Sequence, residues 1–497
     1  MSNFPEFDEV HVISDIHMGG KPGFQILRET QRLANFIDWV SRQRPDGRIA
    51  LVLNGDVFDT LAEDIHGYVA VDEAVATVQR IMDDPSFSTI WKSLADFVKL
   101  EGRALVIVIG NHDIEISFPT VQRLMVLRLA GNDLKARARI EFSTTGAGFT
   151  CFVGNSCVYC THGNEVDAWN YNRYEDLAKV GRRLNAGRSL EPSEWFPNAG
   201  TRMVKEVMND VKRKFAWIDL LKPETSAAIG ALLVLDPSQV KKIGHLLSIV
   251  GEKVQGQKQA DQRLSAEGFQ PPEQNVAVPF NVERLLGTNL KDGVLGVDVT
   301  GGRSADDMLL NAEEHFNSKE AFAAEADSTL GTPQLIWDRL TGWITGVGKD
   351  EALRRAMLDW LAKDKTFDIN DQDDTFKQVT AAVGPSIDFI ITGHTHLERA
   401  VQIGAGRYYF NCGTWIRLLQ FTQDMLKDTA SFKPIYDVLI NGKMETIDNA
   451  EFKGKPFVMD QTSAVSIKEE GGKVVGRLTH VVGDGSGEPF EIKKFPE

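Results

Sequence analysis

The sequence predicts an α/β protein whose core is interrupted by a long, mainly helical segment. Over the first 160 residues, short apolar runs alternate with segments of helical periodicity, which is the pattern of β-α-β units. Each apolar run ends in a cluster of polar residues or glycine. The strand pattern is lost after residue 167 and returns near residue 385.

The N-terminal elements follow one another in a regular order. Strands are expected in VHVISD, IALVLNGD and ALVIVIGNHD, with a helix over Phe24–Arg44 and further helices that reach Leu100. Two more strands are expected, over Arg139–Phe142 and Thr150–Tyr159, and the second is followed by THGNEVD. Open α/β sheets bind ligands with the loops at the carboxyl ends of their strands. The polar runs SDIH, NGD and GNHD are therefore placed where a site would form.

The middle of the chain, residues 168–379, is mostly helical in character. Stretches such as MVKEVMNDVKRKFAWIDLL and DEALRRAMLDWLAK carry apolar residues at three- and four-residue spacing. We interpret this range as a helical insertion between residues 1–167 and residues 380–497, which form the two parts of the core.

The C-terminal part again has the character of strands. Strands are expected in IDFIITGHTH and over Gly406–Trp415. Further strands are expected over Pro434–Ile440, Val465–Lys468 and Val474–Val481. This β-rich extension either extends a core sheet or forms a small appendage.

Composition limits the classes of function. The 55 Lys and Arg against 70 Asp and Glu give a net charge of −15, which argues against a general nucleic-acid binder. The four cysteines are too few for a disulfide-stapled scaffold of 497 residues. The N-terminus lacks the features of a secretory signal, and charged residues interrupt the most apolar window, Ala227–Val250, so that it cannot span a membrane. We expect a cytoplasmic protein.

Five short motifs each follow a predicted strand and contain five of the ten histidines. In chain order the motifs are Asp15-Ile16-His17, Gly55-Asp56, Gly110-Asn111-His112-Asp113, His162-Gly163 and Gly393-His394-Thr395-His396. Each is weak by itself, since an isolated Asp or His at a strand end more often closes a turn. Five in this order are hard to obtain by chance. Carboxylate, amide and imidazole groups together suit a pair of divalent metal ions.

Together the motifs resemble the signature of the calcineurin-like metallophosphoesterases. For the core, the resemblance implies an αββα sandwich, in which two facing mixed sheets are flanked by helices. The large helical insertion, which the resemblance does not cover, is expected to act as a cap because it lies between His162 and His394 in the chain. It implies that Asp56 bridges two metal ions. It also implies two further ligand sets, Asp15, His17 and His396 for one ion, and Asn111, His162 and His394 for the other.

The resemblance also implies the reaction. A hydroxide that bridges two metal ions attacks a phosphate ester, which is a phosphodiester, a pyrophosphate or a monoester. Mn²⁺ is the family expectation, and Fe, Zn, Mg or Ni suit the same ligand types.

Two residues outside the ligand set are implied to take part in catalysis. His112 resembles the residue that stabilises the transition state or protonates the leaving oxygen. Asp59 is placed like the carboxylate that orients this histidine, although it also suits the cap of the following helix. Asp113, Asn164 and Asp167 either face the substrate or close turns.

Within the superfamily, SDIHMGG, NGDVFD and FNCGTW are most similar to the branch of UDP-2,3-diacylglucosamine hydrolases. His112 stands where that branch carries Arg, and the insertion here is longer, so the substrate stays open. Alternatives are a nuclease or nucleotide phosphodiesterase, with phosphate contacts from residues such as Lys205 and Lys212, and a non-catalytic scaffold. A peripheral membrane contact through Ile229–Leu235 is a further hypothesis.

Overall fold

The structure, a computed structural model, describes residues 4–63, 73–167, 170–188, 197–222, 235, 347–361 and 365–497. Contacts within the chain divide it into two compact units. The sheet unit comprises Met1–Thr201, Lys365–Leu418 and Val458–Glu497, and the helical unit comprises Arg202–Asp364 and Leu419–Phe457. Each is described by itself.

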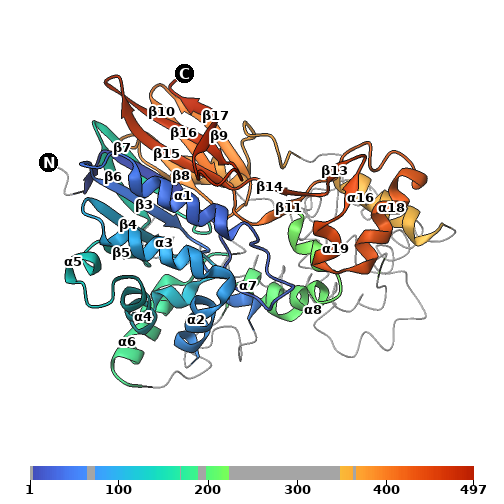
Figure 1. The fold of residues 1–497 in the computed structure, drawn as a ribbon, viewed down its shortest axis with the longest axis horizontal. Coiled ribbons are helices and arrows are strands. Elements are labelled where there is room, and N and C mark those ends of the chain that lie inside the picture. Colours follow the sequence, from blue (N-terminus) through green and yellow to red (C-terminus); the bar gives the residue numbers. More distant parts are fainter. Residues whose placement is uncertain are drawn as a thin grey trace, which may run out of the picture. The chain divides into compact units, whose positions relative to one another are not determined.

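A seven-stranded sheet forms one half of the sheet unit (Figure 1). Its strands, in spatial order, are β17 (Pro489–Phe495), β16 (Lys473–Val481), β15 (Ser463–Glu470), β2 (Glu9–Ile13), β3 (Ile49–Asn54), β4 (Arg103–Val108) and β5 (Ile140–Ser143). The strands from β2 to β5 are parallel, whereas β15 joins β2 in antiparallel register, with Val465 opposite Val12. The C-terminal strands therefore extend the core sheet and are not an appendage.

A six-stranded mixed sheet forms the other half of the sheet unit. Its strands, in spatial order, are β1 (Glu6–Phe7), β6 (Phe149–Val153), β7 (Ser156–Cys160), β8 (Phe389–Thr392), β10 (Arg407–Cys412) and β9 (Glu398–Gly404). β7 and β8 are parallel neighbours although 228 residues lie between Cys160, which ends β7, and Phe389, which starts β8. The insertion therefore leaves from one strand of this sheet and the chain returns to the next.

Burial on both faces of the strands explains their apolar runs. Val12 and Val52 pack into a core that also contains Phe389 and Phe410 of the six-stranded sheet, so the two sheets face each other. Leu51 and Leu105 of the seven-stranded sheet lie in a second core with helical residues. Because successive side chains of a strand point to opposite faces, both faces must be apolar.

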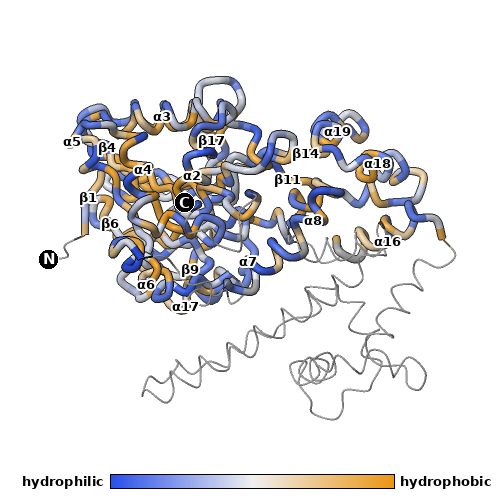
Figure 2. Tube along the Cα trace, turned by 90° about the horizontal axis from the view of Figure 1, so that it is seen from below, coloured by the Kyte–Doolittle hydropathy of each residue, from blue (hydrophilic) through white to orange (hydrophobic). Residues whose placement is uncertain are grey.

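Helices cover the outer faces of both sheets. Apolar residues of α1 (Thr30–Arg42), α2 (Ala74–Asp83), α3 (Ser88–Lys99), α4 (Pro119–Ala130), α5 (Leu134–Arg137) and α6 (Tyr174–Asn185) share the core beside the seven-stranded sheet. Phe376 and Val379 of α17 (Asp374–Ala382) pack with Ile390 and Tyr409 of the six-stranded sheet. Figure 2 shows apolar residues concentrated along β4 and the sides of α2 and α4. The predicted αββα arrangement is confirmed.

The unit boundaries differ from the predicted ranges. α6 and the first part of α17 lie within residues 168–379 but belong to the sheet unit, whereas residues 419–457 lie within 380–497 but belong to the helical unit. α7 (Ala199–Met203) contains the first boundary. Whether the insertion acts as a cap stays a prediction.

The described part of the helical unit contains α8 (Asn209–Lys212), α16 (Lys349–Leu361), α18 (Thr429–Asn441), α19 (Met444–Asp448) and the short pair β12 (Glu451–Phe452) and β13 (Lys455–Pro456). A second short pair joins β11 (Arg417–Leu419) and β14 (Val458–Asp460), which belong to the sheet unit apart from Leu419. Trp217 is buried and donates from Nε1 to the Leu439 carbonyl of α18 at 3.0 Å.

The strand expected over Pro434–Ile440 is wrong, because these residues lie in α18. Asp428 caps this helix by accepting a hydrogen bond from the backbone N–H of Ser431 at 2.8 Å, and Gly442 ends it in the left-handed conformation. Helical spacing then places Phe432, Ile435 and Leu439 in the interior. The caps outweigh the β-branched and aromatic composition.

The cysteines and the helices bear on two expectations from the sequence. All four cysteines are free and buried, which agrees with a fold that is not held together by disulfides. In the described ranges, no helix combines the length and the apolar character that crossing a membrane requires.

Candidate metal site

The five motifs occupy the carboxyl ends of five strands. Asp15 and His17 follow β2, Asp56 follows β3, and Asn111 follows β4 in the seven-stranded sheet. His162 follows β7, and His394 and His396 follow β8 in the six-stranded sheet. The two facing sheets thus both contribute loops to the same edge of the sandwich, as the sequence predicts.

The backbone of this edge is unusual. Of the eight non-glycine residues with positive φ in the described ranges, five are predicted ligands. These five are Asp15, His17, Asp56, His394 and His396, with φ from 52° to 70°. Non-glycine residues adopt such angles rarely, and strained residues cluster at functional sites because the surrounding structure holds them there. The strain therefore supports a functional assignment of this edge.

Two glycines allow the loops to approach each other closely. Gly55 has φ +89°, and a Cβ there would lie 2.3 Å from Nδ1 of His162. A Cβ on Gly110 would lie 2.0 Å from Oδ1 of Asp56. The glycines of these two motifs are therefore needed for packing of the site itself.

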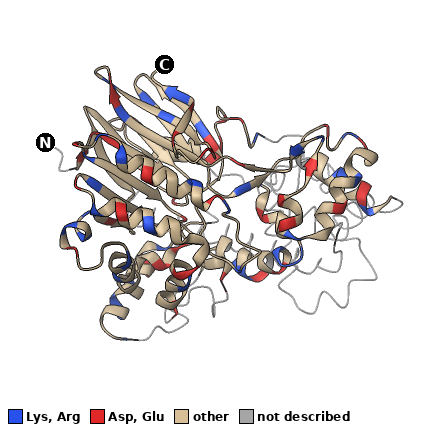
Figure 3. Ribbon diagram, in the orientation of Figure 1, with Lys and Arg blue, Asp and Glu red and all other residues tan. Residues whose placement is uncertain are grey.

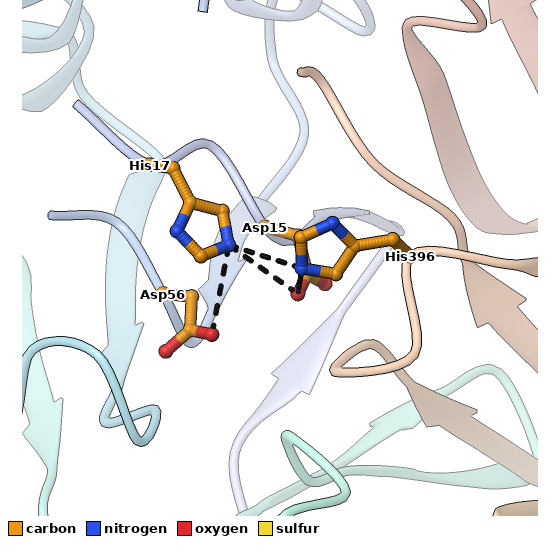
Figure 4. Close-up of side chains that lie close together, drawn as sticks. All are labelled: Asp15, His17, Asp56 and His396. Atoms are coloured by element: carbon orange, nitrogen blue, oxygen red, sulfur yellow. Dashed lines mark hydrogen bonds and ion pairs between the residues drawn. The ribbon is translucent and has the colours of Figure 1, made fainter. Parts of the chain in front are cut away.

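Four buried side chains form the centre of the site (Figure 4). One nitrogen or oxygen atom from each of Asp15, His17, Asp56 and His396 lies within 4.8 Å of those of the other three. The Nε2 atoms of His17 and His396 are 3.1 Å apart, and Oδ1 of Asp15 is 3.1 Å from Nε2 of His396. The structure therefore brings together three residues of the first predicted set and the predicted bridge.

Asp56 lies between the two predicted sets. Its Oδ2 is 3.7 Å from Nε2 of His17 and 3.2 Å from Nε2 of His162. Its Oδ1 accepts a hydrogen bond from the backbone N–H of His112 at 2.8 Å. One carboxylate oxygen thus faces a histidine of each set, which is the arrangement that a bridging ligand requires.

The donors and acceptors of the site do not match without a cation. His162 donates from Nδ1 to the carbonyl of Asn54 at 2.8 Å, so the lone pair of the neutral ring is on Nε2, which faces the Asp56 carboxylate. Oδ1 of Asp15 and Oδ1 of Asn111 are buried and accept no hydrogen bond from the described residues. Buried acceptors that face one another need a proton or a metal ion between them. The residues therefore fit divalent cations.

Electrostatics around the carboxylates agree with this picture. Burial by itself would raise the pKa of Asp15 and of Asp56, but neighbouring histidines outweigh it and hold both pKa values well below their usual range. Burial would lower the pKa of His162, and the Asp56 carboxylate instead raises it to about 10. Burial and then His112 lower the pKa of His17 to about 3. The pKa shifts of Asp15, Asp56 and His162 thus all favour positive charge beside the two carboxylates.

His394 lies beside His162, and the two ring centroids are 5.3 Å apart. The backbone N–H of His394 donates to Oδ2 of Asp15 at 2.9 Å, and its Nε2 is 2.9 Å from Oδ2 of Asp167. Asn111 is buried, with 5% of its surface exposed. The second predicted set therefore lies at the same edge as the first.

His112 and Asp59 are in contact. Nδ1 of His112 is 3.1 Å from Oδ1 of Asp59, and the His112 ring packs edge-on against His17 with 4.8 Å between centroids. Asp59 also caps the turn Thr60–Ala62 by accepting a hydrogen bond from the backbone N–H of Ala62. Both readings of Asp59 from the sequence are thus compatible with its geometry. The His112 side chain is 20% exposed, whereas that of His17 is 2% exposed, so His112 is the more accessible of the two.

Of the three residues with open roles, Asp113 and Asn164 close turns. Asp113 accepts hydrogen bonds from the backbone N–H groups of Gly110 and Val57, which ties two of the loops together. Burial and then the charge of Asp56 raise the pKa of Asp113 to about 7. Asn164 donates to the carbonyl of Asn170 within its own loop. The contact of Asp167 with His394 was not predicted, because it joins segments 227 residues apart.

Comparison with known families covers the first four motifs. The family model of the calcineurin-like phosphoesterases matches residues 9–223. No curated protein and no solved structure matches the chain. Residues 9–223 thus contain a calcineurin-like phosphoesterase domain, and His394 and His396 join its site from outside the matched range. With the buried Asp and His cluster, this domain indicates a metal-dependent phosphoester hydrolase.

Proposed function

We propose that this protein is a dinuclear metallohydrolase that cleaves a phosphate ester. The observation that carries the proposal is the buried cluster of Asp15, His17, Asp56 and His396, in which one potential ligand atom of each residue lies within 4.8 Å of those of the others. Two divalent ions would supply a nucleophile by lowering the pKa of water and would neutralise charge on the phosphoryl oxygens. We propose Mn²⁺ as the native ion, because the family resemblance favours it.

The family resemblance divides the ligands into two sets, and the contacts of Asp56 agree with this division. Asp15, His17 and His396 would hold one ion, and Asn111, His162 and His394 the other. Asp56 would bridge both, because its Oδ2 faces one histidine of each set. The hydrogen bond from the His112 backbone to the other oxygen of Asp56 fixes the plane of this carboxylate. The loops therefore hold the ligands in place before any ion binds.

His112 would interact with the substrate. Asp59 accepts from its Nδ1 and so favours the ring that carries a proton there. The same carboxylate stabilises the doubly protonated ring, which can hold charge near the phosphoryl group and pass a proton to the leaving oxygen. Asp59 acts through His112 and is a positioning residue.

The sequence features around Asp15, Asp56 and Cys412 support a substrate like that of the UDP-2,3-diacylglucosamine hydrolase branch, which is a pyrophosphate. We extend the proposal only to the bond type, a phosphodiester or pyrophosphate in preference to a monoester. The helical insertion would select the rest of the substrate as a cap over the metal site. The proposed membrane-contacting stretch Ile229–Leu235 lies, apart from Leu235, outside the described residues.

A nuclease is the less supported alternative. Lys212 pairs with Asp219 at 2.7 Å, and Arg213 pairs with Asp210, so acidic residues neutralise these candidate phosphate contacts. Figure 3 shows Lys and Arg interspersed with Asp and Glu along the described part of the ribbon. A nucleic acid would gain little from such a surface. A non-catalytic scaffold would have no need for the strained, acceptor-rich edge.

The test compares hydrolysis of bis-p-nitrophenyl phosphate with that of p-nitrophenyl phosphate, in Mn²⁺ or EDTA. The variants are Asp56→Ala and His112→Ala, and Asp96→Ala on the exposed face of α3 is the matched control. We expect Mn²⁺-dependent hydrolysis, faster for the diester, in the native protein and the control. We expect loss of activity in both site variants.

The two site variants should differ in metal content. Asp56→Ala should lose metal, whereas His112→Ala should retain it, since His112 is not assigned as a ligand. A native protein that binds no Mn²⁺ would overturn the proposal. Activity that persists in EDTA after exhaustive dialysis would do the same.

A further inference from the structure

The loop that follows His162 contacts His394 and the residue before Asn111, two positions that belong to or adjoin one predicted ligand set. We call its described residues, 163–167 and 170–172, the His162 loop. His162 leads directly into it, and His394 lies against Asp167. Asn172, which is 3% exposed, donates from Nδ2 to the carbonyl of Gly110 at 2.8 Å, next to Asn111. The loop thus continues from one residue of this set, contacts a second and is bonded to the neighbour of the third.

Internal hydrogen bonds hold Asp167 in place. The backbone N–H of Asp167 donates to the carbonyl of Asn164 at 3.2 Å, and the backbone N–H of Asn170 donates to the carbonyl of Asp167 at 3.0 Å. The buried Asn164 donates from Nδ2 to the carbonyl of Asn170 at 3.1 Å. Asn170 also donates from Nδ2 to Oδ2 of Asp167 at 2.7 Å. The carboxylate is therefore fixed before it meets His394.

The contact between Asp167 and His394 determines which ring nitrogen is available to a metal. When Oδ2 of Asp167 accepts the hydrogen of Nε2, the neutral ring carries its lone pair on Nδ1. A carboxylate that accepts from the second nitrogen of a histidine also raises the basicity of the first and fixes the ring orientation. The backbone N–H of His394, bonded to Asp15, holds the other end of this residue.

We propose that Asp167 is a positioning residue that orients His394 for the second metal ion and leaves the first ion unaffected. The proposal rests on the two-metal function proposed above. The residues of the first set are held by other contacts. His396 lies against Asp15, and the backbone N–H of His17 donates to the carbonyl of Asp56 at 2.9 Å. Loss of Asp167 should therefore affect the two ions unequally.

The experiment measures Mn²⁺ binding by isothermal titration calorimetry and metal content after dialysis, for the native chain, Asp167→Ala and Asp167→Asn. Asp176→Asn is the matched control, because Asp176 pairs with Lys179 on α6 in the sheet unit. We expect two ions in the native chain and in the control. Asp167→Ala should weaken one of the two ions by about 10- to 100-fold and leave the other unchanged.

Asp167→Asn keeps an acceptor oxygen without the charge, so it should weaken the same ion by a smaller factor, and it tests the idea even if Asp167→Ala does not fold. Two unchanged affinities in the Asn variant and the Ala variant would overturn the proposal, and so would an equal loss at both sites. A native chain that binds fewer than two ions would instead overturn the two-metal function itself. The two failures are thus distinguishable.

Discussion

Replacement of Gly110 by alanine tests how closely the site depends on the contact between two strand-end loops. A Cβ at this position would lie 2.0 Å from Oδ1 and 2.4 Å from the backbone nitrogen of Asp56. Cβ atoms in proteins essentially never lie closer than 3.0 Å to such atoms, so the loops that contain Gly110 and Asp56 must separate by about 1 Å. The backbone conformation of Gly110 is open to alanine, since its φ lies outside the left-handed region. The effect is therefore a pure displacement of Asp56.

The magnitude follows from this displacement. A misplacement of about 1 Å costs on the order of 10²-fold in rate, and overpacking costs about 1–3 kcal/mol of unfolding free energy. We expect Gly110→Ala to fold, to bind less Mn²⁺ and to lose about 10²-fold in kcat/KM on bis-p-nitrophenyl phosphate. Gly384→Ala is the control, because a Cβ there meets nothing within 4 Å. Native activity and native metal content in Gly110→Ala would refute the reasoning.

Three further predictions concern the metal, the acid and the core. Removal of metal by EDTA should lower the melting temperature in calorimetry, since an ion at 100 times its Kd stabilises the folded state by about 2.7 kcal/mol; an unchanged melting temperature would contradict this. His112→Ala should lose about 10²- to 10⁴-fold in kcat with unchanged Mn²⁺ content, and Asp59→Asn should lose less in kcat. If His112→Ala lost bound Mn²⁺ along with its activity, His112 would instead be a metal ligand. Arg103→Met should lower the free energy of unfolding, measured in urea, by at least about 3 kcal/mol without loss of metal. The buried guanidinium donates to four backbone carbonyls, and each hydrogen bond of a charged group contributes about 1.5–3 kcal/mol. A change below about 1 kcal/mol would count against this account.

The fold and the placement of the motifs could be predicted because local pattern determines them. Strands buried on both faces are apolar at nearly every position, as in Ile49–Asn54, where only the last residue is polar, so they stand out in the sequence. Parallel strands also bring their carboxyl ends to one edge. Asp15 and Asp56 were therefore predicted to lie together although nothing in the sequence states their distance.

Two features were not predicted from the sequence: the helix Thr429–Asn441 and the contact between Asp167 and His394. The helix Thr429–Asn441 has strand-like composition, and only the Asp428 cap and the spacing of Phe432, Ile435 and Leu439 reveal it. Those signals were present in the sequence, but the prediction of a strand relied on β propensity, which is the weaker guide. The pairing of Asp167 with His394 had no local signal at all, because it depends on how two distant loops meet.

The sequence determines the fold of the core better than it determines where the insertion ends. The return of the chain to the core was expected at residue 380, whereas the sheet unit resumes at Lys365, because α17 packs Phe376 and Val379 on the six-stranded sheet. An amphipathic helix reads the same in the sequence whether its apolar face meets a core sheet or another helix. The boundary therefore depends on contacts that periodicity does not encode.

The most direct test of the central claim is a count of Mn²⁺ ions per chain. The native protein, Asp56→Ala and the control Asp96→Ala are stripped with EDTA, titrated with Mn²⁺ by calorimetry and analysed for bound metal after dialysis. Because Oδ2 of Asp56 faces a histidine of each ligand set, we predict two ions for the native protein and the control, and weakened binding of both ions in Asp56→Ala. Fewer than two ions in the native protein, or two ions with native affinity in Asp56→Ala, would contradict a dinuclear site bridged by this carboxylate.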